Sequence, residues 1–166
     1  MKKIVFIAFL LLFTAQSCGI YNFTGSGPIT GETVQIDYFP NNAPLVEPSV
    51  SQKFTVALQD LFTRQTNLKQ TSSGGDLHFE GEIVDYKIIP VTATADQTAA
   101  QNRLSITVHV RFYNKLKEED NFEKNFSFFY DYGANEQLIG GTLETALDEI
   151  FERITQDIFN AAVAKW

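Results

Sequence analysis

The clearest pattern in the chain is the alternation of apolar and polar residues over residues 103–113. Alternation with a period of two predicts a β-strand that buries one face. The apolar positions expected to face the core are Leu104, Ile106, Val108, Val110 and Phe112. A charged stretch over residues 114–120 separates this strand from an aromatic-rich strand over residues 122–132. The two strands therefore predict a β-hairpin.

Two further segments alternate in the same way, over residues 33–39 and residues 77–89. The first is expected to end at a stretch of prolines and asparagines over residues 40–44, which favours turns. In the second, the alternation is interrupted near Val84, where we expect a β-bulge. Pro90 is expected to end this strand, because proline has no N–H to donate to a β-ladder.

Two segments repeat their apolar residues at helical spacing, over residues 48–66 and residues 142–166. Ser49 or Ser51 is expected to cap the first helix, and Thr142 the second. The apolar stripe of the first is Val50, Phe54, Ala57, Leu58, Leu61 and Phe62. That of the second is Leu143, Leu147, Ile150, Phe151, Ile154, Ile158 and Ala161.

These elements follow one another in the order β-α-β-β-β-α. The order predicts an α+β fold, a two-layer sandwich in which a mostly antiparallel four-stranded sheet packs against two helices. A length of 166 residues suits one domain. We expect that domain to span residues 33–166.

Aromatic residues in the hairpin exceed what one helical layer can cover. Besides Tyr113, the outward face is expected to hold either Phe126 and Phe128 or Phe129 and Tyr132, depending on the register. Aromatic side chains on an open face indicate a surface for a partner. The alternative is that the N-terminal segment or a loop of the same chain covers them.

The N-terminus has the pattern of a secretion signal. Two lysines precede an uncharged, mostly apolar run over residues 4–15, which is too short to span a bilayer. Small residues then lead to Cys18, as in the lipobox of bacterial lipoproteins. Cys18 is the only cysteine, and it falls where a lipobox requires one. We expect a lipoprotein signal peptide over residues 1–17 and a lipidated tether over residues 18–32; the alternative is an ordinary signal peptide with a chance cysteine.

Composition excludes several classes of protein. The net charge is −7 and the pI is near 4.8, whereas binding to nucleic acid needs clustered basic residues. Removal of residues 1–17 takes away Lys2 and Lys3 and makes the charge −9, with 11 basic and 20 acidic residues. A single cysteine cannot form an internal disulfide, and with two histidines it cannot complete a typical zinc site.

No catalytic grouping is expected. His78 and His109 lie on outward strand positions, and the chain lacks the Gly-x-Ser-x-Gly turn of a hydrolase. Glu80 and Glu82 share a strand face and could form an acid–base pair or bind calcium. A solvated polar strand face is the simpler interpretation. We therefore expect no metal and no cofactor.

Five basic residues gather on the predicted hairpin. Lys115, Lys117 and Lys124 lie at or near its turn, and Arg103 and Arg111 lie on its first strand. This positive end could contact the phosphate groups of a lipid. It could equally be a turn that is charged for solubility.

The mature chain resembles the LptE family, the lipopolysaccharide-assembly lipoproteins of the outer membrane, in its Bacteroidota-like branch. The similar stretches are residues 18–25 (CGIYNFTG), 38–46 (YFPNNAPLV), 79–83 (FEGEI), 102–108 (NRLSITV) and 161–166 (AAVAKW). None of them is a catalytic signature. The resemblance rests on their order along the chain.

The resemblance implies a non-enzymatic protein that plugs the lumen of the LptD β-barrel, helps to assemble it, and takes part in delivering lipopolysaccharide to the outer leaflet. The acyl chains on Cys18 would then lie in the inner leaflet of the outer membrane, with the domain on the periplasmic side and in the lumen. Basic residues of the family contact lipopolysaccharide. The candidates here, chosen by charge alone, are Arg103, Arg111, Lys115, Lys117 and Lys124. The alternatives are a free periplasmic lipoprotein that carries a small lipid and an accessory lipoprotein of another secretion complex.

Overall fold

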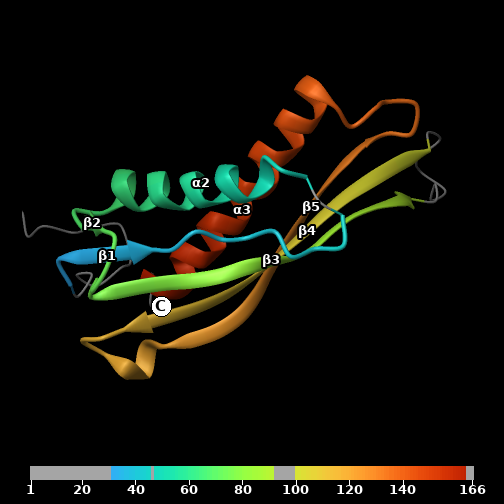
Figure 1. Ribbon diagram of the computed structural model, residues 1–166. Coiled ribbons are helices and arrows are strands. Elements are labelled where there is room, and N and C mark those ends of the chain that lie inside the picture. The colour runs from blue at the N-terminus through green and yellow to red at the C-terminus, as the bar shows by residue number, and fades with distance from the viewer. Residues whose placement is uncertain (1–30, 46, 92–99, 164–166) are drawn as a thin grey trace, which may run out of the picture.

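The computed structural model describes residues 31–45, 47–91 and 100–163. The predicted signal peptide, Cys18 and nearly all of the tether therefore lie outside the described residues, as does most of the loop after Val91. The elements in order are β1 (Thr33–Ile36), α2 (Val50–Gln65), β2 (Lys69–Thr71), β3 (Leu77–Val91), β4 (Gln101–Asn114), the 3-10 helix η2 (Glu118–Asp120), β5 (Phe122–Gly133) and α3 (Gly140–Val163). Both helices pack on one face of the sheet, α2 beside β1 and β2 and α3 across β4 and β5 (Figure 1).

The predicted α+β class is confirmed, but the predicted four-stranded sheet has a fifth strand. The strand order is β2-β1-β3-β4-β5, and β1 runs parallel to both of its neighbours. The missed strand, β2, is three polar residues with no apolar alternation. It forms because α2 serves as the crossover that returns the chain to the outer edge of β1 in a parallel direction.

Strand β3 is longer than predicted. The expected bulge is present between Ile83 and Asp85, where the register with β4 shifts. The expectation that Pro90 ends the strand is wrong, since β3 continues to Val91 and Pro90 lies opposite Asn102. Beyond Ile83 no described strand pairs with the outer side of β3, so a proline is tolerated there as on an edge strand.

The first predicted strand is shorter than its alternation suggested. Strand β1 ends at Ile36, and the chain then follows β3 through single backbone hydrogen bonds, from Asp37 N–H to Phe79 O (2.9 Å) and from Asn42 N–H to Ile83 O (2.9 Å).

The core forms between the sheet and the helices. The five apolar positions predicted on β4 are all fully buried. Aromatic rings connect the layers, because Phe62 of α2 lies 4.9 Å from Phe79 of β3 between ring centroids. They also connect the two helices, because Phe54 of α2 lies 5.4 Å from Phe151 of α3. Each buried ring of this kind contributes roughly 1.5–3 kcal/mol relative to an exposed one.

The helix ends differ in detail from the predictions. Ser49 is the N-cap of α2, but its hydroxyl donates to Glu47 Oε1 (3.1 Å) and makes no capping bond. Helix α3 begins at Gly140, whose φ is +52°, so the predicted cap Thr142 lies within the first turn. Ala162 rather than Ala161 is the buried alanine at its end.

Neither predicted arrangement of the hairpin aromatics is right. The register pairs Val108 with Phe126 and Ile106 with Phe128, which turns both rings toward the helices. Tyr132 is also buried on that side. Phe129 is the only aromatic residue of this strand that faces the open side, where it is 40% exposed. Side chains alternate along a strand, so Phe129 and Tyr132 cannot share a face.

The N-terminal segment joins the domain next to the hairpin turn. Asp76 Oδ2 accepts hydrogen bonds from the backbone N–H groups of Glu32 (2.9 Å) and Thr33 (3.0 Å) and from the Thr33 hydroxyl (2.9 Å). The Asp76 carbonyl in turn accepts from Lys115 N–H (2.9 Å) at the start of the turn. The tether and the hairpin turn therefore lie at the same end of the sheet.

Candidate functional site

The open face of the sheet carries paired charges. Arg103 of β4 and Asp131 of β5 lie directly opposite and form a two-point ion pair, Nε to Oδ1 at 2.7 Å and Nη2 to Oδ2 at 2.8 Å. The guanidinium also lies over the ring of Phe129, 3.6 Å from its centroid. Hydrogen bonds from Arg103 lower the pKa of Asp131 despite its partial burial.

A second pair joins β4 to β3. Arg111 Nε donates to Glu80 Oε1 at 2.7 Å, and the Tyr113 hydroxyl is 3.4 Å from the same oxygen. Glu80 is therefore engaged by a cation, and Glu82 accepts a hydrogen bond from Asn42. The two carboxylates that the sequence placed on one face thus have separate partners.

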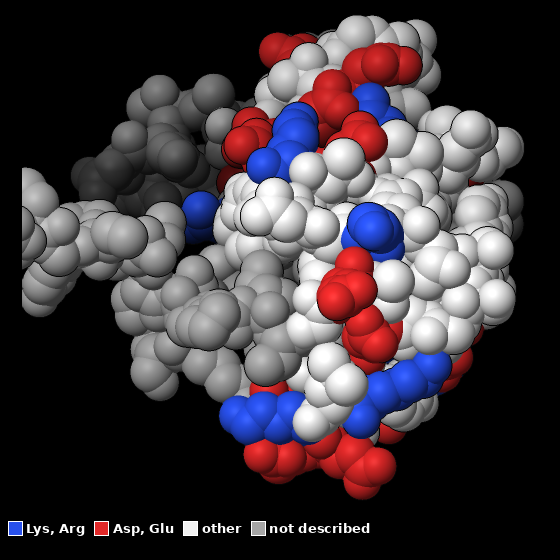
Figure 2. Space-filling view, turned by 90° about the vertical axis from the view of Figure 1, so that its left-hand side faces the viewer, with Lys and Arg blue, Asp and Glu red and all other residues white. Residues whose placement is uncertain are grey.

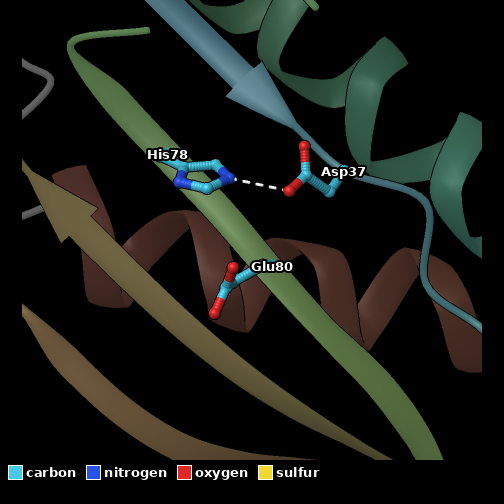
Figure 3. Close-up of side chains that lie close together, drawn as sticks. All are labelled: Asp37, His78 and Glu80. Carbon is cyan, nitrogen blue, oxygen red and sulfur yellow. Dashed lines mark hydrogen bonds and ion pairs between the residues drawn. The ribbon is translucent and has the colours of Figure 1, made fainter. Parts of the chain in front are cut away.

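Asp37, His78 and Glu80 lie close together on this face. Each offers one ligand atom, and these atoms lie within 4.8 Å of one another. His78 Nε2 is 2.8 Å from Asp37 Oδ2, and Gln35 donates to the other Asp37 oxygen at 2.8 Å. Figure 3 shows His78 pointing from β3 toward Asp37, which follows β1. Partial burial would raise the pKa of Asp37, but hydrogen bonds from Gln35 and His78 lower it.

This grouping has the donor types of a divalent-metal site. A cation there would have to displace the proton shared by His78 and Asp37 and to compete with Arg111 for Glu80. The side chains of Asp37, His78 and Glu80 already have partners within the protein. Its evident role is to tie the end of β1 to β3.

The Arg103–Asp131 pair predicts a pH dependence of stability. The pKa of Asp131 is lower in the folded chain than its ordinary value of 3.8. The ion pair of Asp131 therefore stabilises the folded chain fully at pH values above 3.8. This stabilisation is lost as the pH falls through the lower pKa that Asp131 has in the folded chain. Asp131→Asn is expected to cost about 1 kcal/mol or less at pH 7 and to make stability depend less on pH below 4, as measured by urea unfolding. Asp157→Asn on α3 is the control, and an equal pH response of both variants would contradict the prediction.

The lysines of the predicted positive end have different surroundings. Lys117 Nζ is 3.5 Å from Asp120 and 3.9 Å from Glu119. Lys124 Nζ lies over the ring of Phe122, 5.4 Å from its centroid. Figure 2 looks onto this end of the molecule and shows basic and acidic side chains interspersed. The structure thus does not gather the five basic candidates into one patch.

The two arginines are also well separated. They lie eight residues apart on one strand, roughly 27 Å from each other. The sequence pointed to both arginines and to Glu80, but not to Asp131, the partner of Arg103, or to Asp37, the partner of His78. Cross-strand pairing could be read only from the register, which the sequence did not reveal.

In the part of the chain that the structure describes, two cavities border the helices. One of about 620 Å³ lies between α2 and α3, and one of about 420 Å³ lies between α3 and β5. Charged and polar side chains form most of both linings, and the larger includes Lys53, Asp60, Arg64, Asp148 and Glu152. Neither is the apolar cavity that a carrier of a small lipid would need.

The structure is that of a small α+β domain that presents paired charges on an open sheet face. The chain itself is a member of the LptE family, because the family model described as "LptE: Lipopolysaccharide-assembly" matches residues 31–162. The resemblance seen in the sequence is thereby confirmed. Membership assigns the protein to lipopolysaccharide assembly and to a family of non-enzymatic lipoproteins.

One solved structure supports the fold, and a second gives a weaker superposition. A hypothetical protein, CT253 from Chlamydia trachomatis, superposes with a TM-score of 0.52 at 11% identity and covers 81% of this chain and 99% of its own. Lipoprotein B from Nitrosomonas europaea gives a TM-score of 0.48 at 11% identity over 84% of this chain and 86% of its own. No curated protein matches the sequence. Within the described residues, no helix combines the length and apolarity needed to cross a membrane.

Proposed function

We propose that this protein is an outer-membrane lipoprotein, anchored through acyl chains on Cys18, that occupies the lumen of an LptD-type β-barrel. It would help to assemble that barrel and take part in moving lipopolysaccharide to the outer leaflet. The family match carries the proposal. The open sheet face supports it, because barrel interiors are polar and this face presents polar groups whose charges are already compensated.

The position of the tether supports the orientation. The chain from Cys18 to Gly31 can span at most roughly 45 Å when fully extended. A Cβ at Gly31 would lie 3.7 Å from Leu116 Cδ1 in the hairpin turn. This contact supports an orientation in which the end that carries Lys115 and Lys117 faces the membrane.

Contact with lipopolysaccharide is proposed for the basic residues of the hairpin. Lys115 and Lys117 lie in the hairpin turn, at the end of the sheet where the described chain begins, and Lys124 lies on β5 close to the turn. Arg103 and Arg111 would have to exchange a carboxylate for a phosphate, which a planar guanidinium binds in the same two-point geometry.

Reversal of the two turn lysines tests the lipid contact. Lys115→Glu with Lys117→Glu is expected to weaken binding of purified lipopolysaccharide by about tenfold or more, because a charge-assisted hydrogen bond contributes about 1.5–3 kcal/mol. Binding is measured by displacement of a fluorescent lipid A probe from the purified protein. The control is Lys87→Glu at the far end of β3. Equal losses of affinity in both variants would contradict a contact between the hairpin turn and lipopolysaccharide.

The barrel partnership is tested by purification. Epitope-tagged protein is solubilised in mild detergent from the outer membrane of its own organism, and the proteins that co-purify are identified by mass spectrometry. An LptD-type barrel in near-equal amount is expected. Recovery of the tagged protein without a large barrel would overturn the proposal and favour the free lipoprotein.

A further inference from the structure

No strand of the described residues pairs with the outer edge of β5. Strand β5 is the last strand of the sheet, and among the described residues only β4 pairs with it (Figure 1). Its register with β4 runs without a shift from Phe122 to Gly133. Every second residue therefore directs an unpaired N–H and C=O outward, which is a template for another strand.

The other long edge of the sheet is protected. From Asp85 to Val91, β3 has no described partner on its outer side, but a bulge precedes this stretch and Pro90 interrupts it. Lys87 and Asp85 place an ion pair on it, 2.6 Å between Nζ and Oδ2. These are the devices that prevent strand addition. Strand β5 has no bulge and no proline, and its centre, residues 125–130 (NFSFFY), carries no charge.

A cavity lies beside this open edge. It has a volume of about 420 Å³ and is lined by Phe128 of β5 and by Glu149, Glu152, Arg153 and Gln156 of α3. Phe128 is half-buried, and the Arg153 guanidinium lies 5.6 Å from its ring centroid. A strand added to β5 would direct alternate side chains to the helix side, next to this cavity.

The charge of the cavity selects the added side chain. Two carboxylates, on Glu149 and Glu152, face one guanidinium, on Arg153, and neither carboxylate forms an ion pair in the described part of the chain. A lysine or arginine fits here, since its aliphatic part can cover Phe128 while its charge lies between the glutamates. An acidic side chain would be repelled.

A second copy of the chain fits poorly. In antiparallel pairing of two β5 strands centred on Ser127, Glu123 would lie opposite the Asp131 of the other copy. Like charges directly opposite each other destabilise a sheet. The net charge of each chain adds a repulsion of the same sign.

We propose that β5 accepts an extended segment of a partner protein as a sixth strand, and that a basic side chain of this segment enters the cavity between β5 and α3. This mode of binding combines backbone hydrogen bonds, which supply affinity, with one pocket, which supplies specificity. It concerns the edge of the sheet and not the open face, and it does not depend on the partnership with the barrel.

Two extended peptides test the proposal. Both alternate Val and Thr, and they differ only in a central Lys or Glu. Fluorescence anisotropy measures their binding to the full mature protein in detergent, and hydrogen exchange with mass spectrometry measures protection of Phe122–Gly133. The Lys peptide is expected to bind, to slow exchange on β5, and to bind at least about tenfold more tightly than the Glu peptide.

Variants of exposed residues complete the test. Glu149→Lys with Glu152→Lys is expected to lower affinity for the Lys peptide by at least about tenfold, whereas Asp157→Lys, which makes half of that charge change elsewhere on α3, leaves it unchanged. Absence of protection on β5, or equal affinities for the two peptides, would overturn the proposal. Protection of β5 that grows with protein concentration in the absence of peptide would assign the edge to a second copy and overturn it as well.

Discussion

Replacement of Gly81 by Ala is expected to destabilise the domain by at least about 3 kcal/mol, the upper end of what overpacking usually costs. A Cβ at this position would overlap the carbonyl oxygen of His109 on β4 and would lie 2.7 Å from Cε1 of Phe39. The first neighbour is backbone and the second is a fully buried ring. Neither can move aside without disturbing the pairing of β3 with β4.

Thermal unfolding measures this effect. A loss of 3 kcal/mol corresponds to a fall in Tm of roughly 6–12 °C for a chain of this size. Gly141→Ala is the matched control, because a Cβ there meets nothing within 4 Å. Equal melting temperatures for Gly81→Ala and the control would contradict the close approach of the two strands and Phe39.

Replacement of Cys18 by Ser is expected to release the protein from the membrane. Two or more acyl chains give stable anchoring, at about 0.8 kcal/mol for each buried methylene, and serine cannot carry the thioether-linked diacylglycerol. The measurement is the distribution between membrane and soluble fractions, together with incorporation of labelled palmitate.

A displaced thiol provides the control for this prediction. In the double variant Cys18→Ser with Ser26→Cys, the chain keeps one cysteine but loses it from the lipobox. This variant is expected to behave like Cys18→Ser alone. Equal distributions of the wild type and Cys18→Ser between the two fractions, with no palmitate incorporated into either, would show that the cysteine is a chance residue in an ordinary signal peptide.

The elements with long, regular patterns were predictable. Strand β4 alternates through Phe112, and α3 repeats its apolar residues over several turns, and both were predicted within a few residues of their ends. The bulge after Ile83 was also visible as a break in the alternation. In each case a local periodicity determines which side of the element is buried, and the burial of that side stabilises the element.

The candidate site was predictable only in part. Arg103 and Arg111 could be placed on an outward strand face, but their ion pairs with Asp131 and Glu80 depend on which residue of the next strand lies opposite. The same register decides that Phe128 turns toward α3 while Phe129 faces outward beside Arg103. Strand β5 has aromatic residues at both even and odd positions, so the sequence alone does not show which of them face the helices.

The sequence by itself determined the fold class, the buried face of each long element, the family resemblance and the residue expected to carry the anchor. The tertiary structure alone decided the parallel pairing of β1, the strand β2, the continuation of β3 through Pro90 and the partners of every charge on the open face. The physical reason is the range of the interactions. Periodicity and turn chemistry act within a few residues, whereas register, edge position and ion pairing depend on segments that are distant in the chain.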